Sequence, residues 1–277
     1  MRISYYPGCS LQGTAVEYDQ SLKAVAEKLG IELVELPDWN CCGASSAHAL
    51  DFMLAKNLAA RNLAMAERQS MDLLVPCAAC YNRLQTAQEE ERERGQTNYD
   101  FQILNILELL NREEITKKIV SLIKNPLRGL KVVPYYGCLL VRPPRVTGAK
   151  NFENPKEMDY LLKLMGAEVI PWSYKTDCCG GSLILTAKAF VFRLVERILA
   201  QALAAGAEAI AVACPLCHAN LDTRQKEIAQ GAGAEYEIPI FYISELIGLA
   251  FGDKDSRKWW KKHFINPAKI IEKRAVL

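Results

Sequence analysis

The tetrapeptide Asn40-Cys41-Cys42-Gly43 returns later in the chain as Asp177-Cys178-Cys179-Gly180. In each copy the paired cysteines are followed, after 34 residues, by a Cys-x-x-Cys motif, and they are preceded by a lone cysteine in a Tyr-x-Gly-Cys sequence. The four later cysteines of the second set lie 137 positions after those of the first, and the lone cysteine lies 129 positions after its counterpart. This pattern accounts for all 10 cysteines. It indicates an internal duplication, with extra residues inserted after the second lone cysteine.

The sequence around the cysteines alternates between strand and helix patterns. Strands are predicted over Ile3–Tyr6, Ile31–Leu36, Asp72–Val75, Lys131–Pro134, Glu168–Ile170 and Ala209–Val212. Helices are predicted over Ala15–Leu29, Asp51–Arg68, Cys77–Glu90, Glu157–Met165, Leu183–Ala205 and Cys214–Ala229. We therefore expect an α/β fold of two pseudo-symmetric duplicated halves. Each half is a small parallel sheet with flanking helices and with cysteine loops at the carboxyl ends of the strands.

The expected domain boundary lies near Pro126 and Gly129. Residues 1–128 would form the first cysteine-rich domain, with a charged helical linker over 86–128. Residues 129–277 would form the second domain, with a C-terminal tail. We refer to these segments as the first half and the second half.

The net charge and the distribution of apolar residues argue against several classes of protein. The 277 residues carry a formal net charge of +2, which gives no reason to expect a nucleic-acid partner. The most apolar stretch, Leu183–Ala205, contains four charged residues, so we predict a buried helix and no transmembrane segment. The first residues lack a signal-peptide pattern, and we expect a cytoplasmic protein. In that reducing compartment cysteines are metal ligands or redox groups more often than disulfides.

Five cysteines in each half exceed the four ligands of a tetrahedral zinc ion or of an ordinary cubane [4Fe–4S] cluster. Adjacent cysteines suit a cluster with several iron atoms better than they suit one ion. The residues therefore favour iron–sulfur chemistry. Zinc, including zinc in one half only, and structural thiols or disulfides stay as alternatives.

The doubled pattern resembles the paired CCG domains of the heterodisulfide reductase B subunit. The resemblance runs from Tyr6 to about His218, and the tail from Lys261 to Pro267 is also similar to that family. It implies that each half binds a noncubane [4Fe–4S] cluster through five cysteines, and that a disulfide is cleaved between the two clusters. The implied ligands are Cys9, Cys41, Cys42, Cys77 and Cys80 for one cluster and Cys138, Cys178, Cys179, Cys214 and Cys217 for the other.

By this resemblance the chain is the catalytic subunit of a multi-subunit oxidoreductase that acts on sulfur groups, reducing or forming a disulfide such as CoM-S-S-CoB. The sequence has neither a dinucleotide fingerprint nor a ferredoxin-type cysteine run, so electrons must come from another chain. The partners that the resemblance implies are a ferredoxin-like C subunit together with a flavin-containing A subunit. One alternative is a CCG-type electron-transfer subunit of a lactate, glycolate or glycerol-3-phosphate oxidising complex. The other is a zinc-stapled interaction module.

Other side chains are secondary candidates. His48 and His218 lie near the cysteine loops and could donate protons to product thiolates. Tyr6 and Tyr135 are expected to pack at strand ends, with a hydroxyl free for a sulfur contact. The tail Trp259–Phe264 is expected to pack on a partner or on its own domain rather than on a membrane. Five cations could offset cluster charge or bind an anionic substrate, although surface solubility explains each more simply: Arg61, Arg83, Arg142, Arg145 and Lys175.

Overall fold

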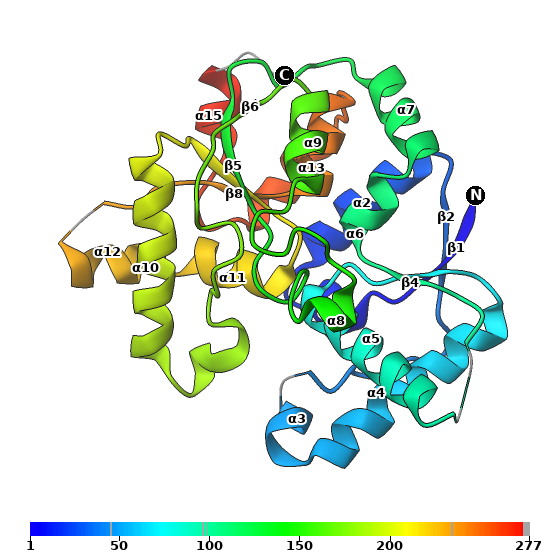
Figure 1. The fold of residues 1–277 in the computed structure, drawn as a ribbon. Helices are drawn as coiled ribbons and strands as arrows, with labels where there is room; N and C mark the ends of the chain where they lie inside the picture. Colours follow the sequence, from blue (N-terminus) through cyan, green and yellow to red (C-terminus); the bar gives the residue numbers. More distant parts are fainter. Residues whose placement is uncertain (45, 96, 98, 234, 274–277) are drawn as a thin grey trace.

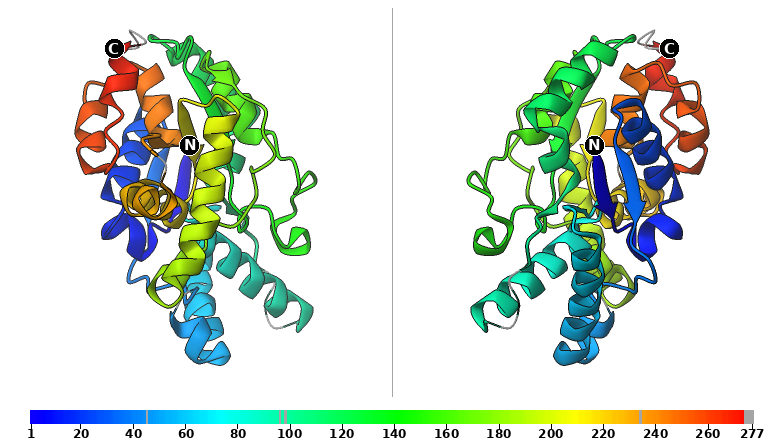
Figure 2. Two further views of the ribbon diagram at one scale, coloured as in Figure 1. Left: turned by 90° about the vertical axis from the view of Figure 1, so that its left-hand side faces the viewer. Right: turned by 90° about the vertical axis from the view of Figure 1, so that its right-hand side faces the viewer.

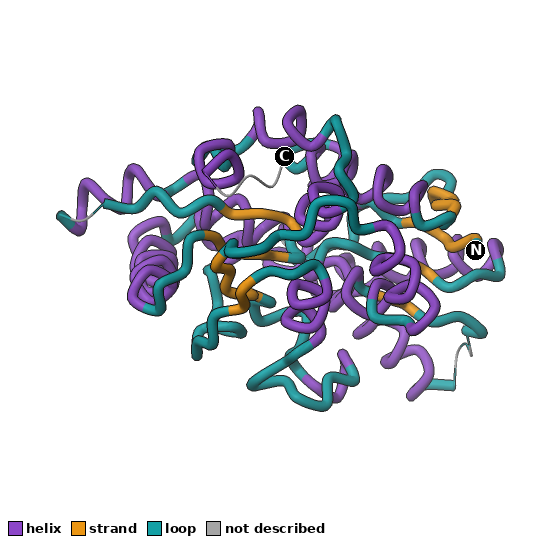
Figure 3. The backbone as a smooth tube through the Cα atoms, turned by 90° about the horizontal axis from the view of Figure 1, so that it is seen from above, coloured by secondary structure: helices purple, strands orange, loops and turns teal. Residues whose placement is uncertain are grey.

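The computed structural model describes residues 1–44, 46–95, 97, 99–233 and 235–273. Two four-stranded sheets form the fold, with strand orders β2-β1-β3-β4 and β6-β5-β7-β8, and every pair of neighbouring strands is parallel. The predicted α/β fold of two duplicated halves is therefore confirmed. Figure 1 shows the first-half strands on the right and the second-half strands toward the upper left. Seen from above in Figure 3, the strands lie between helices.

The first half contains the sheet of β1 (Arg2–Tyr5), β2 (Glu32–Glu35), β3 (Leu73–Leu74) and β4 (Ile103–Leu104). Its helices are α1 (Gly8–Gln12), α2 (Val16–Lys28), α3 (Ser46–Leu50), α4 (Phe52–Gln69), α5 (Ala78–Glu93), α6 (Ile106–Leu110) and α7 (Glu113–Leu122). Local chemistry sets several of these boundaries. The Asp51 side chain caps α4 by accepting bonds from two first-turn amides, and Asn105 with Glu108 forms a capping box that starts α6.

The second half contains the sheet of β5 (Lys131–Tyr135), β6 (Glu168–Val169), β7 (Ala209–Val212) and β8 (Ile240–Tyr242). Its α-helices are α8 (Pro144–Thr147), α9 (Glu157–Leu164), α10 (Lys188–Ala204), α11 (Pro215–Thr223), α12 (Gln225–Ala232), α13 (Ile243–Ala250), α14 (Ser256–Trp259) and α15 (Ala268–Lys273). Two 3-10 helices complete it, η1 (Gly181–Leu185) and η2 (Trp260–Lys262). Glu245 stands at the repeat position of Glu108 and accepts the backbone N–H of Tyr242 at the start of α13.

Three sequence predictions about elements were wrong. Each half has a fourth strand, β4 or β8, that the sequence patterns did not reveal. The helix predicted over Cys214–Ala229 breaks at Arg224 into α11 and α12. The buried helix predicted over Leu183–Ala205 is instead a 3-10 turn followed by α10. The predicted boundary between residues 128 and 129 stays a prediction, and it falls in the connection between α7 and β5.

The segment that leads into α10 is not buried. Leu183 and Leu185 of η1 and Phe190 in the first turn of α10 are exposed. The repeat-related segment at the end of α3 and the start of α4 also carries exposed apolar side chains, those of Leu50, Phe52, Met53 and Leu54. Figures 1 and 2 place both segments at the lower end of the molecule. We call these seven side chains the apolar rim.

Helices of one half pack on helices of the other. The first-half helix α2 lies against the second-half helix α13, and the second-half helix α9 lies against the first-half helix α6. At the α2–α13 contact the rings of Tyr18 and Tyr242 stack with centroids 4.1 Å apart, and the hydroxyl oxygens of Ser21 and Ser244 are 2.7 Å apart. Buried residues from both halves form one continuous hydrophobic core. No helix within the described ranges is both long and apolar enough to span a bilayer.

Because the core is shared, we predict that Tyr18→Ala lowers the stability of both halves together. Tyr18 is fully buried against Tyr242, so losing its ring should cost about 3–5 kcal/mol of unfolding free energy. Urea unfolding followed by circular dichroism should show one transition, shifted to lower urea. Tyr18→Phe keeps the ring and serves as the control, with a shift several times smaller. Two separate transitions in the Tyr18→Ala variant would contradict a shared core.

Candidate functional site

The first cysteine of each set follows strand one through a glycine that no other residue can replace without strain. Gly8 and Gly137 both have positive φ, +66° and +68°. A Cβ at Gly8 would lie 3.2 Å from the Cys80 sulfur, and one at Gly137 would lie 2.9 Å from the Cys217 sulfur. Glycine therefore lets this turn approach the sulfur of the Cys-x-x-Cys motif.

Tyrosine hydroxyls tie that turn to the Cys-Cys loop. The Tyr6 hydroxyl donates to the Asn40 carbonyl at 2.7 Å, and the Tyr135 hydroxyl donates to the Asp177 carbonyl at 2.6 Å. Asn40 and Asp177 are the residues just before the paired cysteines. The prediction of strand-end packing is confirmed by the burial of both rings, but the hydroxyls are not free for a sulfur contact. They hold two cysteine loops together.

Within each half the five thiols come together. The second cysteine of the pair meets the last cysteine of the set: the Sγ atoms of Cys42 and Cys80 are 3.1 Å apart, and those of Cys179 and Cys217 are 3.4 Å apart. The remaining thiols continue these contacts. Neighbouring thiols shift each other's pKa in four further pairs, Cys41 with Cys42, Cys77 with Cys80, Cys138 with Cys178 and Cys214 with Cys217, and Cys9 lies close enough to Cys41 to raise its pKa.

The two sets meet at one point. Cys77 of the first half and Cys214 of the second half are neighbours, and each thiol shifts the pKa of the other. These residues stand at equivalent positions of the repeat, at the starts of helices α5 and α11, and both are buried. The ten thiols therefore form one connected group across the pseudo-symmetry axis. All ten are free cysteines.

Burial divides the thiols into inner and outer groups. Cys42, Cys77, Cys80, Cys179, Cys214 and Cys217 are buried, whereas Cys9, Cys41 and Cys178 are exposed and Cys138 is partly exposed. The outer members stand at matching repeat positions, so each half has one open side and one closed side. Among the described residues, no group of three or more His, Cys, Asp or Glu side chains is arranged to hold a single metal ion.

Neighbouring thiols move several cysteine pKa values in opposite directions. Hydrogen bonds from Cys41 and then from Cys80 hold the pKa of Cys42 well below its ordinary value, and the Arg83 cation acts in the same direction. The hydrogen bond to Cys138 lowers the pKa of Cys178 to about 6. At the repeat-related position, the hydrogen bond to Cys42 and then burial raise the pKa of Cys41. The outer thiols of the two halves therefore differ electrostatically.

The residue about one helical turn after each Cys-x-x-Cys motif lies near a Cys-Cys loop. Arg83 stands three residues after Cys80, and Asn220 stands three residues after Cys217. The Asn220 amide donates to the carbonyls of Cys179 and Gly181 at 3.0 and 2.9 Å. Asn220 was missed in the sequence, although its equivalence to Arg83 in the repeat was a signal that could have identified it.

Surface solubility does not explain all four of the other candidate cations. Arg61 donates to the Asp38 carbonyl, the Asp38 carboxylate and the Asn40 side chain, beside the first Cys-Cys loop. Arg142 pairs with Glu153 at 2.6 Å, and Arg145 is exposed. Lys175 is buried and pairs with Asp159, so its expected explanation as a surface residue was wrong. A direct role of any of these cations toward a bound group stays a prediction.

The histidines differ. His48 is exposed, and its ring faces Phe52. His218 is buried, with its ring stacked on Tyr242 at 4.2 Å and its Nε2 atom 3.1 Å from the Ile240 carbonyl. Burial, and then the neighbouring His263, hold the pKa of His218 well below its ordinary value, so its ring is neutral at pH 7. Proton donation by either residue stays a prediction.

The C-terminal tail packs on its own chain, as expected. Trp259 and Trp260 are buried, and His263 pairs with Glu245 at 3.0 Å. The backbone amides of Phe264 and Ile265 donate to the Asp222 carboxylate at the end of α11. The tail therefore braces the helix that begins beside Cys214.

Known proteins are similar to this chain in sequence and in fold. The family model described as the CCG cysteine-rich domain matches residues 3–85 and again residues 132–222. The chain is 32% identical, over 90% of its length and 92% of the relative's, to the 8-methylmenaquinol:fumarate reductase membrane anchor subunit of Wolinella succinogenes. It is 30% identical, over 91% of its length and 89% of the relative's, to the B subunit of the ferredoxin/F420H2-dependent CoB-CoM heterodisulfide reductase of Methanosarcina acetivorans.

Among solved structures, a hypothetical protein from Helicobacter pylori superimposes with a TM-score of 0.71 at 11% identity. The match covers 96% of this chain and 52% of that one, so the chain spans about half the length of that structure, and the likeness concerns the fold alone. The chain belongs to the CCG cysteine-rich domain family. The resemblance to the heterodisulfide reductase B subunit that the cysteine pattern indicated is confirmed.

The contrast between the two outer thiols gives a prediction for the reduced, metal-free protein. Because the pKa of Cys178 lies near 6, its alkylation by iodoacetamide should speed up as pH rises through about 6, where the thiolate forms. Cys138→Ala removes the hydrogen bond and should move this midpoint up toward the ordinary cysteine value of about 8.5. Mass spectrometry of the alkylated peptides measures both rates.

Cys41 is the internal control for this experiment. Its pKa is raised, so its alkylation should stay slow over the same pH range. An unchanged Cys178 midpoint in the Cys138→Ala variant would show that the contact between these two thiols does not lower the pKa.

Proposed function

We propose that this chain is the catalytic iron–sulfur subunit of a heterodisulfide reductase-type complex. It would reduce or form a disulfide such as CoM-S-S-CoB between two noncubane [4Fe–4S] clusters. The observation that carries the proposal is the meeting of the two cysteine sets at Cys77 and Cys214. Because the two sets meet there, one substrate that approaches from the side of the exposed outer thiols could reach both cluster sites. The relatives that are named as heterodisulfide reductase B subunits support the same function.

The donor set fits such clusters. It consists of thiols alone, five to a half, and Gly8 and Gly137, which lack a Cβ, let the turns of the first cysteines approach the other sulfurs closely. When bound, each cluster supplies one electron, whereas splitting an S–S bond takes two, so two centres match the reaction. The proposed ligands are Cys9, Cys41, Cys42, Cys77 and Cys80 in the first half and Cys138, Cys178, Cys179, Cys214 and Cys217 in the second.

The chain's own residues would charge and orient this site. Cys214 stands at the N-terminus of α11, where the thiols of Cys217 and Cys77 and then the backbone N–H groups of the first turn hold its pKa well below the ordinary value. Arg83 adds positive charge near Cys42, and Asn220 fixes the loop that carries Cys179. The buried inner thiols are kept from water, while the exposed outer thiols leave a side from which a substrate can approach.

Other chains would complete the complex. The proposed partners are a ferredoxin-like C subunit together with a flavin-containing A subunit, because the relatives belong to multi-subunit reductases and electrons must reach this chain from outside. The substrate would be a small thiol or disulfide. A cytoplasmic location would keep the ten cysteines reduced. We keep residues 1–128 and 129–277 as the two proposed domains.

A second candidate function is electron transfer without disulfide chemistry. It is favoured by the relative from Wolinella succinogenes, which is named as a subunit of a fumarate reductase that uses 8-methylmenaquinol. In this case the cysteine sets would hold centres that pass electrons between partner chains. The two functions differ in whether thiols or disulfides interact with the bound centres.

Replacing one proposed ligand in each half tests the proposal. Cys42→Ser and Cys179→Ser should each lower disulfide turnover by at least about 100-fold, because both halves must supply an electron. Ser182→Ala, an exposed residue of η1 next to the second set, is the matched control and should keep its activity. Circular dichroism should show a largely intact fold in all three variants. Full turnover in either cysteine variant refutes the assignment.

Metal analysis separates the proposed cluster from zinc. Anaerobically purified protein should contain about eight iron and eight sulfide per chain, whereas a zinc-stapled module would contain about one or two zinc and no iron. Electron paramagnetic resonance then separates the two redox functions. Under the disulfide reductase proposal, added thiols or disulfides change the cluster signal of the isolated protein. An unchanged signal from an iron-loaded protein favours the electron-transfer function.

A further inference from the structure

Cys138 is followed by the eight extra residues that distinguish the second half from the first. In the second half, the turn that carries this cysteine is tied to the Cys178-Cys179 loop at Lys175. The backbone carbonyl of Lys175 accepts the N–H groups of Tyr136 and Gly137 at 2.8 and 3.1 Å. Tyr136 and Gly137 immediately precede Cys138, and Lys175 lies three residues before Cys178. One residue therefore joins two cysteine-bearing segments.

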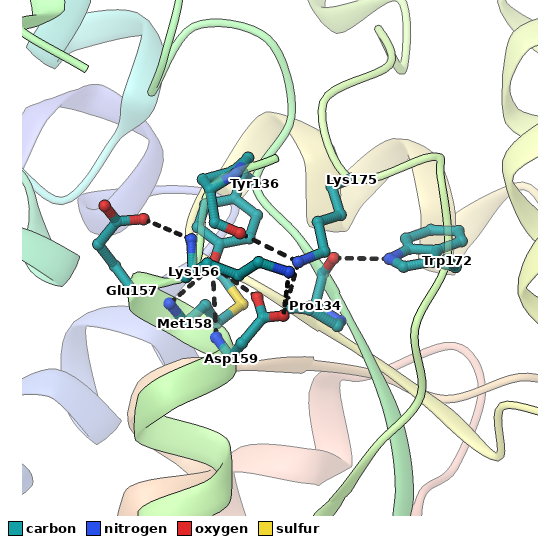
Figure 4. Close-up of polar contacts among 9 residues, drawn as sticks. Pro134, Tyr136, Lys156, Glu157, Met158, Asp159, Trp172 and Lys175 are labelled. Atoms are coloured by element: carbon teal, nitrogen blue, oxygen red, sulfur yellow. Dashed lines mark hydrogen bonds and ion pairs between the residues drawn. The ribbon is translucent and has the colours of Figure 1, made fainter. Parts of the chain in front are cut away.

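The Lys175 side chain is fixed by a buried ion pair. Its Nζ atom lies 2.6 Å from Asp159 Oδ1 and donates to the Pro155 carbonyl at 3.0 Å. The two side chains are only 4% and 10% exposed. Pro155 lies two residues before α9, and Asp159 lies in the first turn of that helix. Figure 4 shows the Lys175 and Asp159 side chains converging, with Trp172 and Pro134 beside them.

The same carboxylate also holds Tyr136. The Tyr136 hydroxyl donates to Asp159 Oδ2 at 2.8 Å and accepts the backbone N–H of Met158 at 2.8 Å. Asp159 thus fixes Lys175 with one oxygen and Tyr136 with the other (Figure 4). Because these two residues lead into the Cys178 and Cys138 segments, this buried carboxylate adds a second tie between them beside the bond from the Tyr135 hydroxyl to the Asp177 carbonyl.

The first half is built differently at the matching positions. Asp38 is the repeat counterpart of Lys175, and Pro7 is the counterpart of Tyr136. Proline has no N–H group, so the bond from Tyr136 to the Lys175 carbonyl has no equivalent there. Asp38 pairs with Arg61 at the surface, with side chains 84% and 44% exposed. Its neighbour Asn40 is held separately by Asn62, through bonds of 3.0 Å in both directions.

We propose that Lys175 is the positioning residue of the second cysteine set: its buried pair with Asp159 holds the Cys138 turn against the Cys178-Cys179 loop. The first set is positioned without such a pair. Removing one member of a buried ion pair leaves an uncompensated buried charge and is strongly destabilising, whereas an exposed pair contributes little. A single charge substitution should therefore loosen the packing of the second cysteine set but leave the first set in place.

Hydrogen–deuterium exchange in the full-length, reduced, metal-free protein tests this inference independently of any bound group. In Lys175→Met, amide exchange in residues 135–139 should accelerate by about 100-fold, because the segment that carries the residue-175 carbonyl loses its side-chain anchor and its bonds to the Tyr136 and Gly137 amides open more often. Exchange in the matching residues 6–10 should stay within about twofold of wild type. Alkylation of the partly exposed Cys138 at fixed pH should accelerate with the same selectivity, while that of Cys9 stays unchanged.

Two further variants make the test decisive. Asp159→Asn keeps hydrogen-bonding atoms but removes the negative charge, and its effect on residues 135–139 should be smaller than that of Lys175→Met in the same direction. If Lys175→Met does not fold, Asp159→Asn carries the test. Arg61→Met removes the exposed first-half pair and should change exchange in residues 38–42 by less than about fivefold. Unchanged exchange in residues 135–139, or equal acceleration in both halves, overturns the proposal.

Discussion

The contact between Cys77 and Cys214 is the point on which the rest of the structure depends. Each thiol begins a helix that follows the third strand of its sheet, so the two parallel sheets must direct their carboxyl ends toward each other for the contact to exist. The remaining thiols extend outward from it along equivalent paths. The fold can therefore be understood as two copies of one unit arranged around a shared sulfur centre.

Cross-packing of helices makes this arrangement rigid. Helix α2 lies on α13 and α9 lies on α6, so each half supplies apolar surface that the other half buries. A relative movement of the halves would break the Tyr18–Tyr242 stack and open the common core. Gly8 and Gly137 place the turns of the first cysteines against sulfur with no space to spare. The distance between the two cysteine sets is consequently fixed by the core, which suits a site that must hold a substrate between them.

The sequence predicted the parts of the structure that repeat, because duplication supplies each of them twice. The cysteine sets, three of the four strands in each half and the helices that follow the Cys-x-x-Cys motifs are of this kind. The strands β4 and β8 were missed because they have only two and three residues and lie outside the repeated cysteine motifs. The exposure of Leu183 and Leu185 in η1 could not be predicted, because an apolar sequence does not show which other elements of the fold pack against it. Lys175 could not be recognised as buried, because its partner Asp159 lies on another element.

The division into inner and outer thiols has a consequence for the protein in air. Oxidation follows exposure and thiolate character, so molecular oxygen and peroxide arriving from solvent encounter Cys9, Cys41 and Cys178 first. Cys178, with its low pKa, is the more readily converted to a sulfenic acid, and Cys138 beside it is placed to trap that acid as a disulfide. In the metal-free protein, aerobic handling would thus oxidise the second half first at Cys178 and Cys138, whereas the six buried thiols are shielded from solvent.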